Sequence, residues 1–125
     1  MKKAYQIVVA LPGIIFLFFG IRWIIDPASA AEALGMPLLD GVGRSTQIGD
    51  MTSFFLSLSV LIFGGLITAK RIWFYVPVMM LGLTAFFRIV AWIVHDAALA
   101  IPLIAPEIII ASLIFFASAK ICERD

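Results

Sequence analysis

The chain has 125 residues, of which 63% are hydrophobic, and its formal net charge is +1 at pH 7. A water-soluble domain of this length could not bury so much apolar surface, because small domains hide too little of their area and soluble chains are only about 45–50% apolar. The near-neutral charge gives no electrostatic basis for binding nucleic acid. The composition therefore predicts an integral membrane protein.

Four apolar stretches account for most of the chain, at residues 4–25, 47–69, 72–94 and 99–121. Each has about 20 residues or slightly more, and at 1.5 Å per residue a helix of that length crosses a hydrocarbon core of about 30 Å. A transmembrane β-barrel would need short segments of alternating polarity instead. We expect a single all-α polytopic membrane domain, a bundle of four transmembrane helices.

The first stretch resembles a secretion signal, because two lysines precede it and Ala-Ser-Ala follows it at 28–30. Its apolar run is longer than the roughly 7–15 residues of a signal, and Arg22 lies before the supposed cleavage site. We expect this stretch to be retained as the first transmembrane helix. Within it, Pro12 can free backbone carbonyls that neighbouring groups must satisfy, and Gly13 and Gly20 favour a close helix contact.

The 26–46 connection is the only long loop. Asp26 followed by Pro27 is typical of a helix N-cap and a first helical residue. The alanine-rich run after them ends at Gly35, which is typical of a helix C-terminus. We expect a short interfacial helix here, and the glycine-rich stretch at 40–43 supplies turn residues before the second transmembrane helix.

The start of the fourth helix is left open by two prolines. The helix begins either near Pro106, which gives a short span, or near Leu99, with a bend at the prolines. Pro102 is compatible with the second alternative only if it lies in the first helical turn.

Basic residues gather on one side of the four-pass layout. They are Lys2, Lys3, Lys70, Arg71, Lys120 and Arg124. The other side carries the 26–46 loop and the turn at His95 and Asp96. Because cytoplasmic loops are enriched in lysine and arginine, we expect both termini in the cytoplasm.

Each helix also carries one ionisable residue toward the predicted outer half: Arg22, Asp50, Arg88 and Glu107. Charges in hydrocarbon are costly, so this cluster is the best functional clue that the sequence offers. Arg88 lies deepest, about 10 Å below the outer end of its helix. We expect Asp50 to be its first partner.

The cluster predicts an outward-facing cavity. The candidate ligand-binding residues, which share its helix faces or its mouth, are Arg88, Asp50, Glu107, Ser53, Ser57, Trp92, His95 and Asp96. A guanidinium could hold a carboxylate, a phosphate headgroup or a quinone oxygen, because its donors form a fixed fork. Asp50 or Glu107 could act as a catalytic acid or base. The alternative is that Arg88 pairs with Asp50 or Glu107 only to fasten the bundle.

Several chemistries lack the residues that they need. The single histidine cannot supply two haem ligands, and His95 and Cys122 are predicted on opposite sides of the membrane, so no zinc site is expected. Glycine-rich phosphate loops and catalytic serine or metalloprotease motifs are also missing from the sequence. We therefore expect neither a metal nor a cofactor.

A sparse set of positions carries a family resemblance. It comprises the loop from Pro27 to Leu34-Gly35, Arg44 five residues before Gly49, Arg88 eight residues before Asp96, and Glu107 at the start of the fourth helix. With these residues the chain resembles the small bacterial membrane proteins of the DoxX-like group, in particular a branch known only as a domain of unknown function. That group usually has a more glycine-rich start to its second helix, where this chain has Gln47-Ile48-Gly49-Asp50.

The better-known members of that group are linked to quinone-coupled sulfur oxidation or serve as accessory subunits of membrane complexes. The resemblance implies a bacterial inner-membrane protein with a partner-dependent role. We expect a non-enzymatic protein that binds a lipid-like or quinone-like molecule or joins a membrane complex, with membrane lipids or a second copy as further partners. The alternatives are a small membrane enzyme, with Arg88 as anion holder, and an oligomeric transporter subunit.

Overall fold

The computed structural model describes residues 1–122, and this part of the chain folds into five helices without a strand. The helices are α1 (Lys2–Ile25), α2 (Pro27–Ala33), α3 (Gly41–Thr68), α4 (Ile72–Val94) and α5 (Ile101–Ile121). All except α2 are long and apolar enough to cross a membrane. The prediction of an all-α bundle with four transmembrane helices and a short helix in the 26–46 connection is confirmed.

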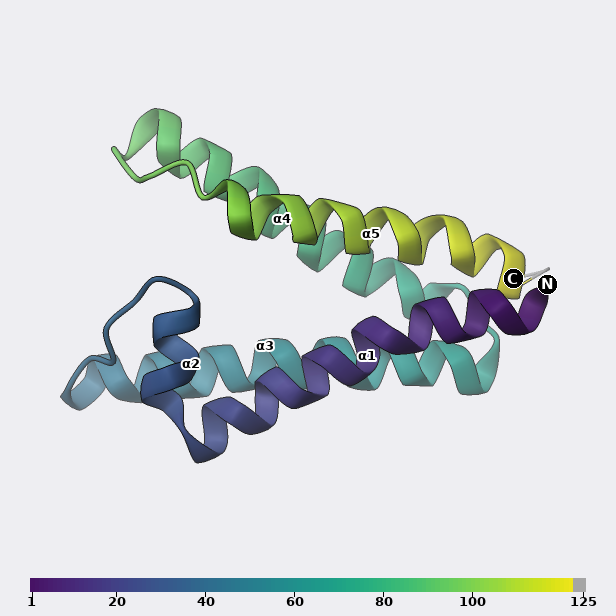
Figure 1. Ribbon diagram of the computed structural model, residues 1–125, viewed down its shortest axis with the longest axis horizontal. Helices are drawn as coiled ribbons and strands as arrows, with labels where there is room; N and C mark the ends of the chain where they lie inside the picture. The colour runs from purple at the N-terminus through teal and green to yellow at the C-terminus, as the bar shows by residue number, and fades with distance from the viewer. Residues whose placement is uncertain (123–125) are drawn as a thin grey trace.

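The four long helices form two antiparallel pairs, α1 with α3 and α4 with α5 (Figure 1). The pairs meet at the terminal end, which comprises both chain termini and the α3–α4 turn at 69–71. They diverge toward the α2 end, which comprises residues 26–40 and the α4–α5 connection at 95–100. Arg124, one of the basic residues predicted at the terminal end, lies outside the described residues.

The predicted N-terminal cap of α2 at Asp26 and its predicted C-terminal signal at Gly35 are both confirmed. The Asp26 carboxylate accepts a hydrogen bond from the backbone N–H of Ser29 at 3.4 Å and caps the helix N-terminus. At the other end Gly35 has a φ of +78°, and the N–H of Met36 donates to the carbonyl of Ala31 at 2.9 Å. This left-handed glycine with a hydrogen bond back across the last turn is a Schellman motif.

The helix α3 begins at Gly41, so the predicted start at Gln47 is wrong. Side chains explain the earlier start: Arg44 forms an ion pair with Asp40 at 3.1 Å, one helical turn away, and donates to the carbonyl of Leu39 at 2.8 Å. The Gln47 amide oxygen accepts from the N–H of Leu39 at 2.8 Å. These contacts hold the glycine-rich stretch as a first helical turn instead of a loop.

The helix α5 begins at Ile101, which is the earlier of the two predicted alternatives. Pro102 lies in the first turn, where its missing N–H removes no helical hydrogen bond. Pro106 lies within the helix. The 21 residues of α5 span about 31 Å at 1.5 Å per residue, which is enough to cross a hydrocarbon core.

A buried hydrogen bond joins α1 to α3. The Ser59 hydroxyl donates to the carbonyl of Gly13 at 2.8 Å, beside Pro12, and Ser59 is only 2% exposed. The sequence pattern had not singled out this serine. The carbonyl that loses its helical donor to Pro12 is that of Val8, four residues earlier, so the expectation about carbonyls freed at Pro12 stays a prediction.

Ser59→Ala should therefore lower the free energy of unfolding by about 1 kcal/mol, because it removes a buried hydrogen bond between two helices. Ser57→Ala is the matched control, since Ser57 is exposed on the same helix, and it should leave stability unchanged. Unfolding by sodium dodecyl sulfate in mixed micelles, followed by circular dichroism, measures both. Equal effects of the two substitutions would contradict the assignment.

Candidate functional site

A cavity of about 450 Å³ lies between the two helix pairs, toward the α2 end. All four spanning helices and Leu34, which follows α2, line it. The space lies where the two pairs diverge (Figure 1), and mostly apolar side chains from both pairs line it.

The wall contributed by α1 and α3 is aromatic. Phe16 and Phe19 of α1 and Phe54 and Phe55 of α3 all line the cavity. Their rings contact one another, with centroids 6.0 Å apart for Phe16 and Phe55 and 5.4 Å apart for Phe19 and Phe55. Aromatic side chains supply large apolar contact areas with defined ring geometry, so this wall suits a flat apolar group.

The opposite wall, from α4 and α5, carries the polar groups. The Nε–H of Arg88 donates to both oxygens of Glu107, at 3.1 and 3.3 Å. The two side chains are 28% and 15% exposed, and the terminal guanidinium nitrogens make no hydrogen bond within the described residues. Arg88 thus keeps donors available beside the cavity while one of its edges holds Glu107.

Helical spacing explains this polar wall. Leu81, Thr84 and Arg88 follow one another at intervals of three and four residues, so they lie on one face of α4. The Thr84 hydroxyl donates to the carbonyl of Met80 within its own helix, at 2.7 Å. Among the cavity-lining residues, Arg88 and Glu107 therefore carry the charge.

A smaller cavity of about 110 Å³ adjoins the larger one under α2. Phe19, Leu34, Phe55 and Leu103 line both. Of these two cavities, Arg22 lines only the smaller one, and Arg88 lines only the larger one. The ion pair of Arg88 and Glu107 therefore lines one of the two adjoining spaces, and a second cation lines the other.

The prediction that Asp50 is the first partner of Arg88 is wrong, because the structure pairs Arg88 with Glu107. The reason lies in the helix pairing: α5 packs directly on α4, whereas α3 packs mainly on α1. Asp50, Ser53 and Ser57 lie exposed on α3 and do not line the cavity. Glu107 therefore remains a candidate acid or base in the cavity, whereas Asp50 is no longer one, because it does not line this space.

The candidates at the end of α4 also lie away from the cavity. Trp92 is 47% exposed, and His95 and Asp96 are exposed beyond or at the end of the helix. None of the three lines the cavity, so the expected place of His95 and Asp96 at its mouth is not what the structure shows. A direct ligand contact by these residues stays a prediction.

Arg71 makes contacts that the sequence did not reveal. Its guanidinium donates to the Ser118 hydroxyl at 3.1 Å and to the Phe115 carbonyl at 2.9 Å, and it lies 5.3 Å from the ring centre of Tyr75. These contacts tie the start of α4 to the end of α5. The sequence suggested only that Arg71 adds positive charge to one side of the membrane.

Within residues 1–122, no three His, Cys, Asp or Glu side chains gather closely enough to hold a metal ion. Comparison with protein-family models, curated proteins and solved structures found no match for the chain. The candidate site is an apolar, partly aromatic cavity within a membrane-spanning bundle, with one ion pair in its wall.

Proposed function

We propose that this membrane protein binds a lipid-like small molecule with a quinone-like head in the cavity between the helix pairs. The observation that carries the proposal is the ion pair of Arg88 and Glu107 in the wall of an otherwise apolar space. Ligand sites in proteins are commonly about 300–1,000 Å³, mainly apolar, and contain a few polar groups that fix orientation. The cavity fits this description in both volume and lining.

The charge balance of the polar wall favours a neutral head over an anionic one. Glu107 already neutralises Arg88, so a carboxylate or phosphate would meet an acidic side chain next to its intended partner. A carbonyl oxygen needs only a donor, and the terminal guanidinium nitrogens of Arg88 supply one. A planar ring held there would face the phenylalanines of α1 and α3. An isoprenoid quinone combines such a ring with an apolar tail.

The DoxX-like resemblance supports the same chemistry, since its better-known members are linked to quinone-coupled reactions. It also supports a bacterial inner-membrane location and a role as accessory subunit to an enzyme that supplies or consumes electrons. A cytoplasmic location of both termini is supported by the basic residues at the terminal end, which are Lys2, Lys3, Lys70, Arg71 and Lys120.

Decylubiquinone is a suitable probe, and calorimetric titration of the detergent-purified protein should show one bound equivalent. Thr84→Phe places a ring in the cavity wall one turn from Arg88. It should weaken binding by about tenfold, because a ligand in the cavity then meets the added ring and overpacking costs about 1–3 kcal/mol. Leu83→Phe is the matched control: Leu83 is the preceding residue, is exposed, and does not line the cavity.

The control should bind the probe as the unchanged protein does, and circular dichroism should show the same helix content for all three proteins. Unaltered binding to the Thr84→Phe protein, or no binding to the unchanged protein, would contradict the proposal.

A further inference from the structure

A surface groove lies on the outside of the bundle, between α1 and α5. This α1–α5 groove has a volume of about 550 Å³ and is lined by Tyr5 and Val8 of α1 and by α5 residues from Ile108 to Lys120. Small residues of α5, Ser112 and Ala117, help to form it. No residue lines both this groove and the internal cavity, so the two spaces are separate.

The length of the groove matches one leaflet of a bilayer. From Ile108 to Lys120 the helix rises about 18 Å at 1.5 Å per residue, slightly more than half of a hydrocarbon core of about 30 Å. An acyl chain enters from one surface and ends near the middle of the membrane, as the groove does.

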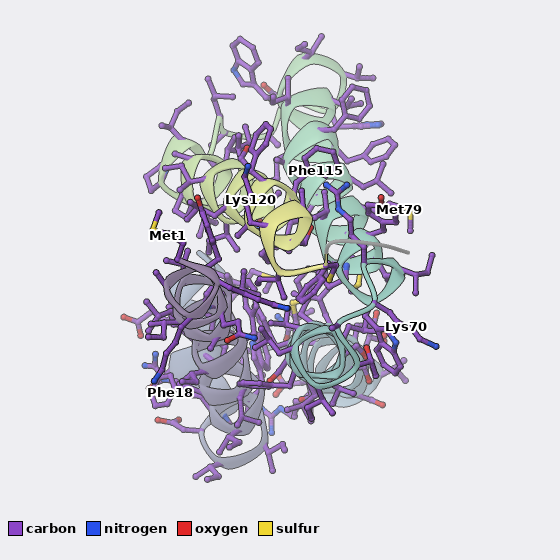
Figure 2. All side chains as sticks on the ribbon, turned by 90° about the vertical axis from the view of Figure 1, so that its right-hand side faces the viewer. Met1, Phe18, Lys70, Met79, Phe115 and Lys120 are labelled. Carbon is purple, nitrogen blue, oxygen red and sulfur yellow. The ribbon has the colours of Figure 1, made fainter. Side chains whose placement is uncertain are left out.

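Two of the three polar side chains that line the groove, Lys120 and Tyr5, lie at its terminal end, and the third, Ser112, lies near the middle of α5. Lysine and tyrosine at the end of a spanning helix reach the headgroup level. Lys120 makes no ion pair with a described residue. Figure 2, which views the bundle from the terminal end, shows Lys120 on the side of Met1 and Lys70 on the opposite side.

The charge distribution indicates which headgroup would be held. All carboxylates of the described residues lie in α2, in its flanking segments, in the α4–α5 connection, or in the halves of α3 and α5 nearer the α2 end, whereas the terminal end carries lysines and Arg71. The carboxylates are Asp26, Glu32, Asp40, Asp50, Asp96 and Glu107. A basic membrane surface of this kind attracts anionic lipids.

We propose that the α1–α5 groove is a binding site for an anionic glycerophospholipid. One acyl chain lies along α5 in the groove, and the phosphate contacts the Lys120 ammonium, with the Tyr5 hydroxyl at the same level. The leaflet concerned is the one at the terminal end of the bundle. This site is independent of the quinone-like ligand proposed for the internal cavity.

Native mass spectrometry of the full chain in neutral detergent tests the proposal, with phosphatidylglycerol and phosphatidylcholine that carry the same palmitoyl chains. One phosphatidylglycerol should bind about fivefold more tightly than phosphatidylcholine, since a lysine near an anionic surface contributes about 1 kcal/mol. Lys120→Gln should abolish this preference. Ser112→Phe should fill the groove and weaken the binding of both lipids.

Two matched controls make the test specific. Lys70→Gln removes the same charge from the opposite side of the terminal end, and Ala119→Phe adds the same ring at an exposed position of α5 outside the groove. Both should bind lipid as the unchanged protein does. Equal loss of preference in the Lys120 and Lys70 variants would overturn the site, as would unchanged binding to the Ser112→Phe protein. If Ser112→Phe instead converts a dimer into monomers, a second copy occupies the groove and the proposal is wrong.

Discussion

Glu107→Leu should lower the free energy of unfolding by about 3 kcal/mol, and Arg88→Leu should lower it by less. Removing one member of a partly buried ion pair leaves the other charge unpaired in an apolar space. An unpaired guanidinium stays charged, whereas a carboxyl group can become neutral by binding a proton. Unfolding by sodium dodecyl sulfate in mixed micelles measures the difference. Equal stability of both variants and the unchanged protein would show that the pair contributes nothing to the fold.

The double replacement Arg88→Leu/Glu107→Leu separates a structural role from a binding role. It leaves no unpaired charge, so its stability should return to within about 1 kcal/mol of the unchanged protein. The same double variant should not bind decylubiquinone, because the donor for the carbonyl oxygen is gone. If it binds the probe normally, the ion pair only fastens α4 to α5.

Much of the fold could be predicted because its causes are local. Spans of about 20 apolar residues fit the membrane thickness wherever they occur in a chain. The limits of α2 follow from Asp26 and Gly35, which act on backbone within one turn. The early start of α3 was missed because the glycines favour a turn, while the ion pair of Asp40 and Arg44 that favours helix forms only in the folded geometry.

The candidate site was predicted only in part, because its composition depends on which helices are neighbours. Four charged residues at similar depth allow several pairings, and the sequence does not fix the order of helices around the bundle. Asp50 and Ser53 were assigned to the cavity because helical spacing places them on one face at the depth of the charged cluster, yet the buried face of α3 carries Leu58 and Ile62, both fully buried. The aromatic wall went unnoticed because phenylalanines are common throughout this chain.

The glycines also show that the sequence does not reveal which helices are neighbours. Gly13 and Gly20 were expected to permit close helix contact, and a Cβ at Gly20 would lie 2.5 Å from a terminal carbon of Leu56 on α3. The sequence did not distinguish these positions from Gly49, where a Cβ would meet nothing within 4 Å. Small residues mark a helix contact only when a second helix is already known to be there.

Gly65→Ala should lower the free energy of unfolding by about 2 kcal/mol. A Cβ at Gly65 would lie 2.5 Å from the ring of Phe74, which is 0% exposed, so the ring or one of the two helices must shift. Overpacking of a closed contact costs about 1–3 kcal/mol. Gly82→Ala is the matched control: nothing lies within 4 Å of its Cβ position, so alanine should stabilise the helix by about 0.5 kcal/mol.

The contact at Gly65 also bears on the cavity. Gly65 lies near the α3–α4 turn, where the two helix pairs meet. A side chain at residue 65 that forces α4 away from α3 should change the angle at which the pairs diverge. Folded Gly65→Ala protein should therefore bind decylubiquinone more weakly, although residue 65 does not line the cavity. Gly82→Ala should bind the probe normally. If the two variants are equally stable and bind equally well, close packing at this end does not set the shape of the site.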